Sequence, residues 1–152
     1  MPPRLPFFKQ ETPYSCVPAC LRMVLSHLGI EASEDELRLR SLTTLWGTNA
    51  RDAIACAKSF GLQAKEVREA TIENLREWLN QGLFPILLID LRPIHGEVGR
   101  HAIVAEETSE NQLLCLDPLA DRRALDLDVI EQAWRMNHYR AILISPPQTA
   151  TE

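Results

Sequence analysis

Apolar positions along the chain follow helical spacing in some segments and form short, dense runs in others, which predicts a mixture of helices and strands. The clearest helical stripe passes through Val17, Leu21, Val24, Leu25 and Leu28. Pro18 is tolerated in the first turn of a helix, where its missing N–H would have no intrahelical partner, and Gly29 suits a helix end. A helix that begins near Cys16 and packs on a core is therefore expected.

The same patterns predict the remaining elements. Further helices are expected from Ser33 to about Ser41, Asn49 to Gly61, Thr71 to Gly82 and Asp128 to about Trp134. Strands are expected at 62–67, 84–91, 101–107, 111–116, 125–127 and 139–145. The run at 84–91 is so short and so apolar that it indicates a central, buried strand. The segments 43–48 and 93–99 have no clear period and are expected to be loops, the second of them mobile.

A hairpin is predicted where 101–107 and 111–116 are joined by the turn residues of 108–111. A turn centred near Ser109 would set His101 directly opposite Asp117. Facing side chains on an antiparallel ladder have Cβ atoms roughly 4.5–5.5 Å apart, so an imidazole can reach a carboxylate. The hairpin therefore brings a histidine to an aspartate.

These elements indicate an α+β fold in one domain over residues 1–152, with a frayed tail after about residue 146. A hydrophobic content of 45% and a charged content of 24% are those of an ordinary globular protein. The net charge of −5 offers no basic surface for nucleic acid, so no nucleic-acid partner is expected. The N-terminus lacks the apolar core of a signal peptide, and the longest apolar run is too short to span a bilayer. A cytoplasmic protein without an integral membrane segment is expected.

Cys16 is the candidate nucleophile. In the first turn of a helix, a thiol feels the unsatisfied N–H groups and the positive end of the macrodipole, which favour the thiolate. The alternative is that Cys16 is simply a small buried hydrophobe, which is the commoner situation for a cysteine. Position alone does not decide between them.

Three other residues complete a possible catalytic group. Gln10 precedes Cys16 by six residues, and its amide can help the Cys16 N–H to hold an oxyanion. His101 can take the thiol proton, and Asp117 can fix the histidine tautomer. The alternatives are a solvated Gln10, a His101 bonded to backbone, and an Asp117 that only forms a turn. His95 and His138 are rival bases, and His95 could instead gate the cleft.

The other cysteines and the tryptophans have simpler interpretations. Cys16 and Cys20 lie on one helical face and could form a redox pair, or bind zinc with His27 or His101, but four convincing ligands are not found. No metal and no cofactor are therefore expected, and Cys20, Cys56 and Cys115 are expected to be free thiols. Trp46 and Trp78 are expected to be packing residues.

Three segments, QETPYSCVPACLRMVLSHLG, RHAIVAEE and LLCLDPLADRRAL, resemble the signature regions of the C39-like, papain-fold cysteine peptidases, and they occur in the same order. The resemblance implies a helical half that bears Cys16, packed on a mainly antiparallel sheet that bears His101 and Asp117. It also implies that Gln10, Cys16, His101 and Asp117 supply oxyanion donor, nucleophile, base and orienting carboxylate.

The resemblance implies a cysteine peptidase that hydrolyses a peptide or related amide through a Cys16 acyl-enzyme, with a peptide or protein substrate. Acyl transfer to an amine is a second possible outcome of the same chemistry. The alternative is a peptide-binding or interaction module on the same fold, with a vestigial or gated triad. The best-known members are domains of peptide exporters that cleave after Gly-Gly. This sequence has no transporter part, so recruitment to an exporter is left open.

Overall fold

The computed structural model describes residues 5–147. The helices are α1 (Cys16–His27), α2 (Glu34–Arg40), α3 (Ala50–Ser59), α4 (Ile72–Asn80), α5 (Arg92–His95) and α6 (Leu127–Arg135). The strands are β1 (Gln63–Val67), β2 (Ile86–Asp90), β3 (Arg100–Thr108), β4 (Gln112–Leu116), β5 (Arg122–Asp126) and β6 (Arg140–Ser145). No helix within this range is long and apolar enough to cross a membrane.

The strands form one sheet in the order β1-β6-β2-β3-β4-β5, and every neighbouring pair is antiparallel. β2 lies between β6 and β3, and its residues from Ile86 to Ile89 are buried. The sequence prediction of a central, buried strand here is confirmed. An unbroken apolar run fits this position because both faces of the strand are covered.

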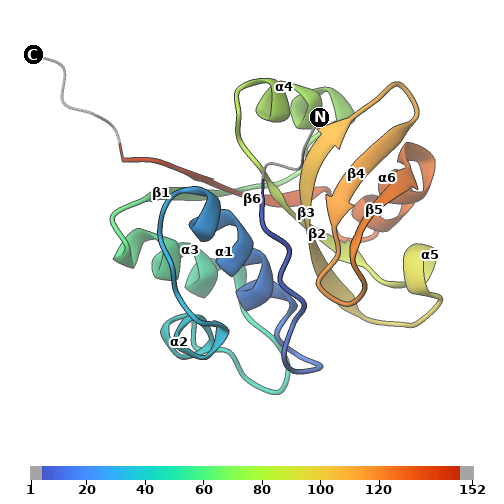
Figure 1. The fold of residues 1–152 in the computed structure, drawn as a ribbon. Helices are drawn as coiled ribbons and strands as arrows, with labels where there is room; N and C mark the ends of the chain where they lie inside the picture. The colour runs from blue at the N-terminus through green and yellow to red at the C-terminus, as the bar shows by residue number, and fades with distance from the viewer. Residues whose placement is uncertain (1–4, 148–152) are drawn as a thin grey trace, which may run out of the picture.

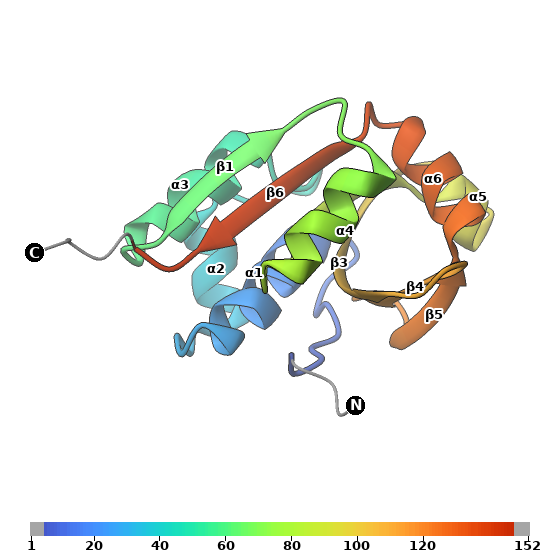
Figure 2. The same cartoon turned by 90° about the horizontal axis from the view of Figure 1, so that it is seen from above.

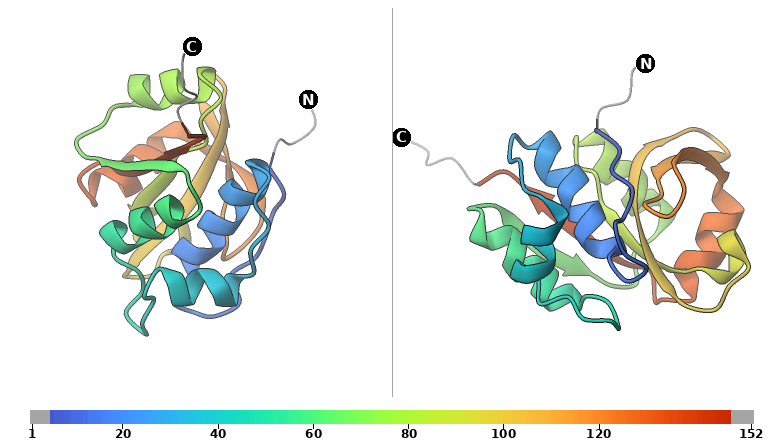
Figure 3. Two further views of the ribbon diagram at one scale, coloured as in Figure 1. Left: turned by 90° about the vertical axis from the view of Figure 1, so that its left-hand side faces the viewer. Right: turned by 60° about the horizontal axis from the view of Figure 1, so that its bottom comes forward.

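The helices form two groups beside the sheet, and α4 lies apart from both, against β3. Figure 1 shows α1, α2 and α3 together on one side, with α5 and α6 beside β4 and β5 on the other. Figures 2 and 3 show the same separation from other directions. α1 packs on β3, α3 packs on β1 and β6, and α6 packs on β2. The predicted α+β architecture, with a helical half against an antiparallel sheet, is confirmed.

α1 begins at Cys16, as its sequence predicts. Val17, Leu21, Val24 and Leu25 are buried, and Gly29 follows the helix with a φ of 85°, which a glycine adopts without strain. Burying these apolar side chains stabilises the protein by roughly 1.5–3 kcal/mol for each large one. The apolar stripe thus fixes the helix, and with it Cys16, against the sheet.

The β3–β4 hairpin has a different register from the predicted one. Val104 lies opposite Leu116, and a bulge interrupts the ladder between Ala105 and Glu107. His101 and Asp117 therefore do not face each other directly, and that prediction is wrong. The ladder is displaced by two residues, because the turn closes between Ser109 and Gln112 and the bulge inserts Glu106. An even displacement keeps side chains on the same face of a sheet, so the two residues are diagonal neighbours and still meet.

Two further predictions differ from the structure or lie outside it. The segment 93–99 is expected from the sequence to be a mobile loop, but its first residues belong to the short helix α5. Pro93 suits the first turn of this helix, and Gly96 ends it with a φ of 73°. The tail expected to fray after about residue 146 falls mostly on 148–152, outside the described residues. α5 matters for the site because it carries His95.

Candidate active site

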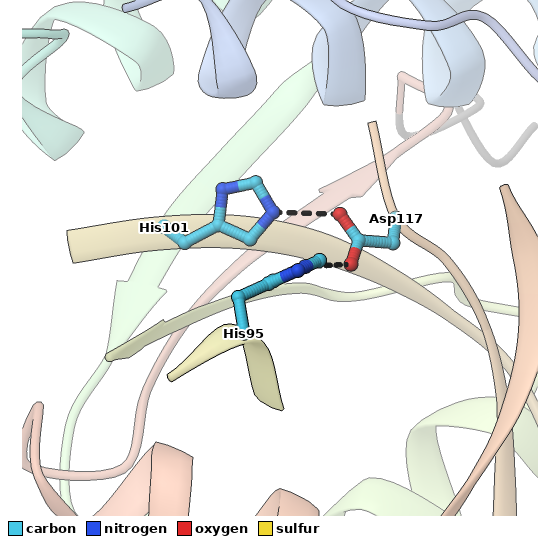
Figure 4. Close-up of side chains that lie close together, drawn as sticks. All are labelled: His95, His101 and Asp117. Carbon is cyan, nitrogen blue, oxygen red and sulfur yellow. Dashed lines mark hydrogen bonds and ion pairs between the residues drawn. The ribbon is translucent and has the colours of Figure 1, made fainter. Parts of the chain in front are cut away.

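The Asp117 carboxylate accepts hydrogen bonds from two histidines, one on each oxygen. His101 Nε2 lies 2.7 Å from Oδ1, and His95 Nε2 lies 2.8 Å from Oδ2. Figure 4 shows the two imidazoles approaching the carboxylate from β3 and from α5. The backbone N–H of Leu119 also donates to Oδ1 at 3.0 Å. The carboxylate is completely buried, so these donors replace its water.

These contacts fix the charge of Asp117 and the tautomer of His101. Burial raises the pKa of Asp117, but hydrogen bonds and charge from His101, with a bond from His95, outweigh it and lower the pKa to about 2. An ionised carboxylate only accepts hydrogen bonds, so Nε2 of each histidine carries the hydrogen. In neutral His101 this leaves Nδ1 as a proton acceptor. Figure 4 shows that nitrogen on the side of the ring away from Asp117.

Cys16 is the first residue of α1, and backbone N–H groups surround its sulfur. The N–H groups of Ala102, Val17 and Cys16 itself lower the pKa of the thiol. Because β4 pairs with β3 only from Val104 onward, the β3 edge at Ala102 is open toward α1. Burial has the larger effect and raises the pKa of Cys16 to about 11. The predicted helix start is present and its N–H groups favour the thiolate, but burial outweighs them, although Cys16 is only half-buried by surface and lines a pocket.

Gln10 lies beside the segment that follows Asp117. Its backbone N–H donates to the carbonyl of Pro118 at 2.9 Å. Its side-chain Nε2 donates to the carbonyl of Thr12 at 2.7 Å, and its Oε1 is buried without a hydrogen-bond partner among the described residues. One of the two amide hydrogens is therefore committed within the loop that leads to Cys16, and the other remains.

The two rival histidines have different surroundings. His95 joins Asp117, although the sequence suggested only a loop histidine that could act as a base or a gate. His138 is 72% exposed and lies 3.8 Å from Glu69, whereas the histidines that contact Asp117 are His95 and His101. The only sequence signal for the role of His95 was its place near Pro93 and Gly96, which did not reveal which side chain it would meet.

Glu34 anchors the loop that carries the nucleophile. Its side chain is 1% exposed, and Oε1 accepts a hydrogen bond from the Glu11 N–H at 3.0 Å. Arg38 lies 3.2 Å from the other oxygen. The sequence offered no signal beyond the acidic first turn of α2, because burial of one member of an acidic run depends on the tertiary fold.

Cys16 and His101 line the same pocket, which has a volume of about 340 Å³ and is here called the Cys16 pocket. Val17 and Leu88 form part of its apolar wall, and Trp46 lies at its edge. Trp46 is 97% exposed, so the prediction that it is a packing residue is wrong. It sits in a tight turn closed by hydrogen bonds between Thr44 and Gly47. The nucleophile and base candidates thus share an accessible space.

The residues that could hold a metal are a different group from the one considered in the sequence. Within residues 5–147, His95, His101 and Asp117 each offer one ligand atom, and these atoms lie within 4.8 Å of one another, close enough to share a metal ion. Cys16 and Cys20 are outside it, and both are free thiols. In this structure each histidine instead donates a hydrogen bond to its own oxygen of Asp117, which orients both imidazoles.

Comparison with known proteins gives a family match over nearly the whole chain. Residues 4–148 match the model of the peptidase C39 family. An uncharacterized protein of Methanothermobacter marburgensis is 42% identical over 129 residues, which is 85% of this chain and 82% of that protein.

Solved structures share the fold. A putative C39-like peptidase from Bacillus anthracis superposes with a TM-score of 0.79 and 15% identity, covering 95% of this chain and 96% of that one. The peptidase domain of Streptococcus ComA, a bifunctional ABC transporter, superposes with a TM-score of 0.76 and 25% identity. The match covers 94% of this chain and 98% of that one. A double glycine motif protease from an AMS/PCAT transporter, solved in complex with the leader peptide, superposes with a TM-score of 0.78 and 18% identity. The match covers 93% of this chain and 91% of that one. The papain-like fold expected from the sequence is confirmed.

Proposed function

Because the chain belongs to the peptidase C39 family, we propose that it is a cysteine peptidase that hydrolyses a peptide or related amide through an acyl-enzyme on Cys16. The observation that carries this proposal is the buried 2.7 Å hydrogen bond between His101 and Asp117, beside a pocket that Cys16 and His101 both line. A base of fixed tautomer next to a thiol is what nucleophilic catalysis requires.

In the first step, the Cys16 sulfur attacks the carbonyl carbon of the substrate, and the thiol proton passes to Nδ1 of His101. The electron pair of the carbonyl bond moves onto oxygen. Gln10, through its remaining amide hydrogen, and the N–H of Cys16 are the proposed donors to this oxyanion. Asp117 stabilises the imidazolium that forms, because its carboxylate stays ionised down to about pH 2.

In the second step, the oxyanion collapses and the C–N bond breaks. The proton on His101 Nδ1 passes to the departing amine, which leaves a thioester on Cys16. Water then attacks the thioester and gives a proton to His101. The C–S bond breaks, the sulfur regains the proton from His101, and a carboxylic acid is released.

The high pKa of Cys16 makes His101 necessary in this scheme. A thiol with a pKa of about 11 keeps its proton in water at neutral pH. Transfer to His101 instead creates an ion pair beside Asp117, which costs less than a lone buried thiolate. His95 is a positioning residue, because it holds the second oxygen of Asp117 and so fixes the carboxylate that orients His101.

The test is cleavage of a mixed peptide library followed by mass spectrometry. We expect cleavage by the wild type and loss of it in Cys16→Ala and His101→Ala. Cys56→Ala, which removes a thiol from α3, is the matched control and should keep activity. Mass mapping of acid-quenched enzyme should find the acyl group on Cys16, and hydroxylamine should release it as a free hydroxamate and restore the thiol.

Cleavage that persists in Cys16→Ala would refute the proposal. Saturable peptide binding without cleavage, unchanged by Cys16→Ala, would identify an interaction module instead. Products joined to an added amine would indicate acyl transfer through the same thioester.

A further inference from the structure

The charge that lines the Cys16 pocket is opposite in sign to that of the whole chain. The chain carries a net charge of −5. Yet the charged side chains at the pocket are Arg100 and Arg140, which line it together with His101, and none of the described residues that line it is an aspartate or glutamate. A concave site that carries one sign of charge concentrates ligands of the other sign. The pocket therefore favours an anionic group.

Arg100 is available to such a group. It is exposed, and its guanidinium makes no hydrogen bond or ion pair with any residue between 5 and 147. The residue opposite it on β2 is Asp90, but that carboxylate is held by Arg92, whose Nε lies 3.2 Å from Oδ1. The arginine next to the proposed base in sequence thus forms no ion pair with the described residues, although Asp90 lies opposite it.

Arg140 contributes a second guanidinium, and its terminal N–H groups make no hydrogen bond with the described residues. Its Nε lies 2.7 Å from Glu66 Oε2, which also binds Arg68 Nε at 3.0 Å. One carboxylate therefore serves two arginines, so a positive charge is left over. Because the contact with Glu66 uses Nε of Arg140, the terminal nitrogens remain for a planar carboxylate, the partner that a guanidinium fork matches best.

Asn137 adds a neutral donor that lacks a partner. It is only 7% exposed and lines the pocket, and its side-chain amide makes no hydrogen bond with another described residue. Asn137 lies in a tight turn. Its backbone N–H donates to the carbonyl of Trp134, and the two residues that follow, His138 and Tyr139, have φ of 59° and 51°. Its amide atoms reach the solvent of the pocket, where the N–H groups can donate to a ligand oxygen.

We propose that the Cys16 pocket binds a carboxylate of the substrate next to the cleaved bond, through Arg100, Arg140 and Asn137. This inference rests on the proposed peptidase function. The carboxylate belongs either to an acidic side chain or to the free C-terminus of a short peptide. The volume of about 340 Å³ is at the lower end of the roughly 300–1,000 Å³ typical of ligand pockets and suits a side chain or a chain end.

The test compares kcat/KM for peptides matched except for charge. Each acidic peptide is paired with one in which Glu is replaced by Gln beside the cleaved bond, and each free acid with its C-terminal amide. The wild type should prefer the carboxylate roughly ten-fold to a hundred-fold, the loss expected when a charge-assisted hydrogen bond is removed. A preference in the Glu and Gln pairs identifies a side chain, and one in the acid and amide pairs identifies a chain end.

Variants connect this preference to the pocket. Arg100→Gln should bring the ratio close to one, and Arg100→Glu should favour Lys-containing peptides instead. Arg51→Gln removes an exposed arginine of α3 that does not line the pocket, and it should leave the ratio unchanged. An equal rate on charged and neutral peptides, with Cys16-dependent cleavage intact, would overturn the inference while the peptidase function stands.

If no peptide is cleaved, binding decides the matter. The Cys16→Ala protein is titrated with fluorescent acidic and neutral peptides of the same pairs. Tighter binding of the acidic peptide, lost in Arg100→Gln, would support a carboxylate site on a protein that is not a peptidase. Equal affinities would overturn it.

Discussion

His95 and Asp117 are joined by a 2.8 Å hydrogen bond between Nε2 and Oδ2, although 22 residues separate them in the chain. The bond ties α5 to the turn after β4. It leaves Oδ1 for His101, so each oxygen of the carboxylate has its own imidazole. The carboxylate then cannot rotate without breaking two charge-assisted hydrogen bonds.

Replacing His95 should therefore affect turnover more than substrate binding. We expect His95→Ala to lower kcat about five-fold to ten-fold, the effect of losing roughly 1 kcal/mol of positioning, with KM changed less than two-fold. His95→Gln keeps an amide donor and should restore much of kcat. Steady-state kinetics of both variants test this. An equal loss in both, or a change confined to KM, would contradict a positioning role.

The low pKa of Asp117 predicts how stability depends on pH. Its folded-state pKa of about 2 lies below the ordinary 3.8, so ionised Asp117 stabilises the folded protein above about pH 4. That contribution, roughly 2 kcal/mol, should disappear as the pH falls from about 4 to 2. Chemical denaturation of wild type and Asp117→Asn should show a stability difference at pH 7 that shrinks over this range.

The matched control is Asp121→Asn, which changes an exposed aspartate of the same turn. Its stability difference from wild type should be small at every pH. A difference between wild type and Asp117→Asn that stays constant from pH 7 to 2 would show that the carboxylate charge does not contribute.

Glu106 should be important for stability rather than activity. It is 3% exposed, and it accepts hydrogen bonds from the Leu5 N–H at 3.2 Å and from Arg122 Nε at 3.1 Å. Arg122 also donates to the carbonyl of Leu5. Glu106→Ala should lower the free energy of unfolding by about 2 kcal/mol, because it leaves buried donors unpaired. Glu107→Ala, at an exposed neighbour, should cost less than about 0.5 kcal/mol. Equal effects in urea denaturation would contradict this assignment.

Metal independence is a further expectation. The reaction described above uses thiol, imidazole and carboxylate, so EDTA should leave the rate unchanged. Added zinc should inhibit, because His95, His101 and Asp117 offer three ligand atoms within 4.8 Å of one another, and bound zinc would remove the base. Loss of activity in EDTA that zinc restores would contradict the proposed chemistry.

The sequence predicted most of the fold because its strongest signals are local. The stripe from Val17 to Leu28 defined α1, and the apolar run near Ile86 defined the buried centre of the sheet. The hairpin register was wrong by two residues, because the turn shifts the pairing by three and the bulge at Glu106 shifts it back by one. The bulge depends on partners far away in the chain, such as Leu5 and Arg122. The side of the sheet was still correct, since side chains alternate with a period of two.

The site was only partly predictable for the same reason. Cys16 could be recognised from its helix start, and His101 and Asp117 from the hairpin. The second histidine on Asp117, the unpaired Arg100 and the buried Asn137 arise where distant segments meet, and no local pattern marks them. The roles of Gln10, Cys16, His101 and Asp117, and the cytoplasmic location, stay predictions.

The most direct test of Cys16 activation by His101 is the rate of Cys16 alkylation by iodoacetamide between pH 5 and 11. Peptide mass mapping identifies the modified cysteine in wild type and in His101→Ala. In wild type, Cys16 should react at neutral pH and faster than the buried Cys115. In His101→Ala, which lacks the proton acceptor, its reaction should rise only at alkaline pH, because burial raises the pKa of the thiol. Superimposable profiles in the two proteins would contradict activation of Cys16 by His101.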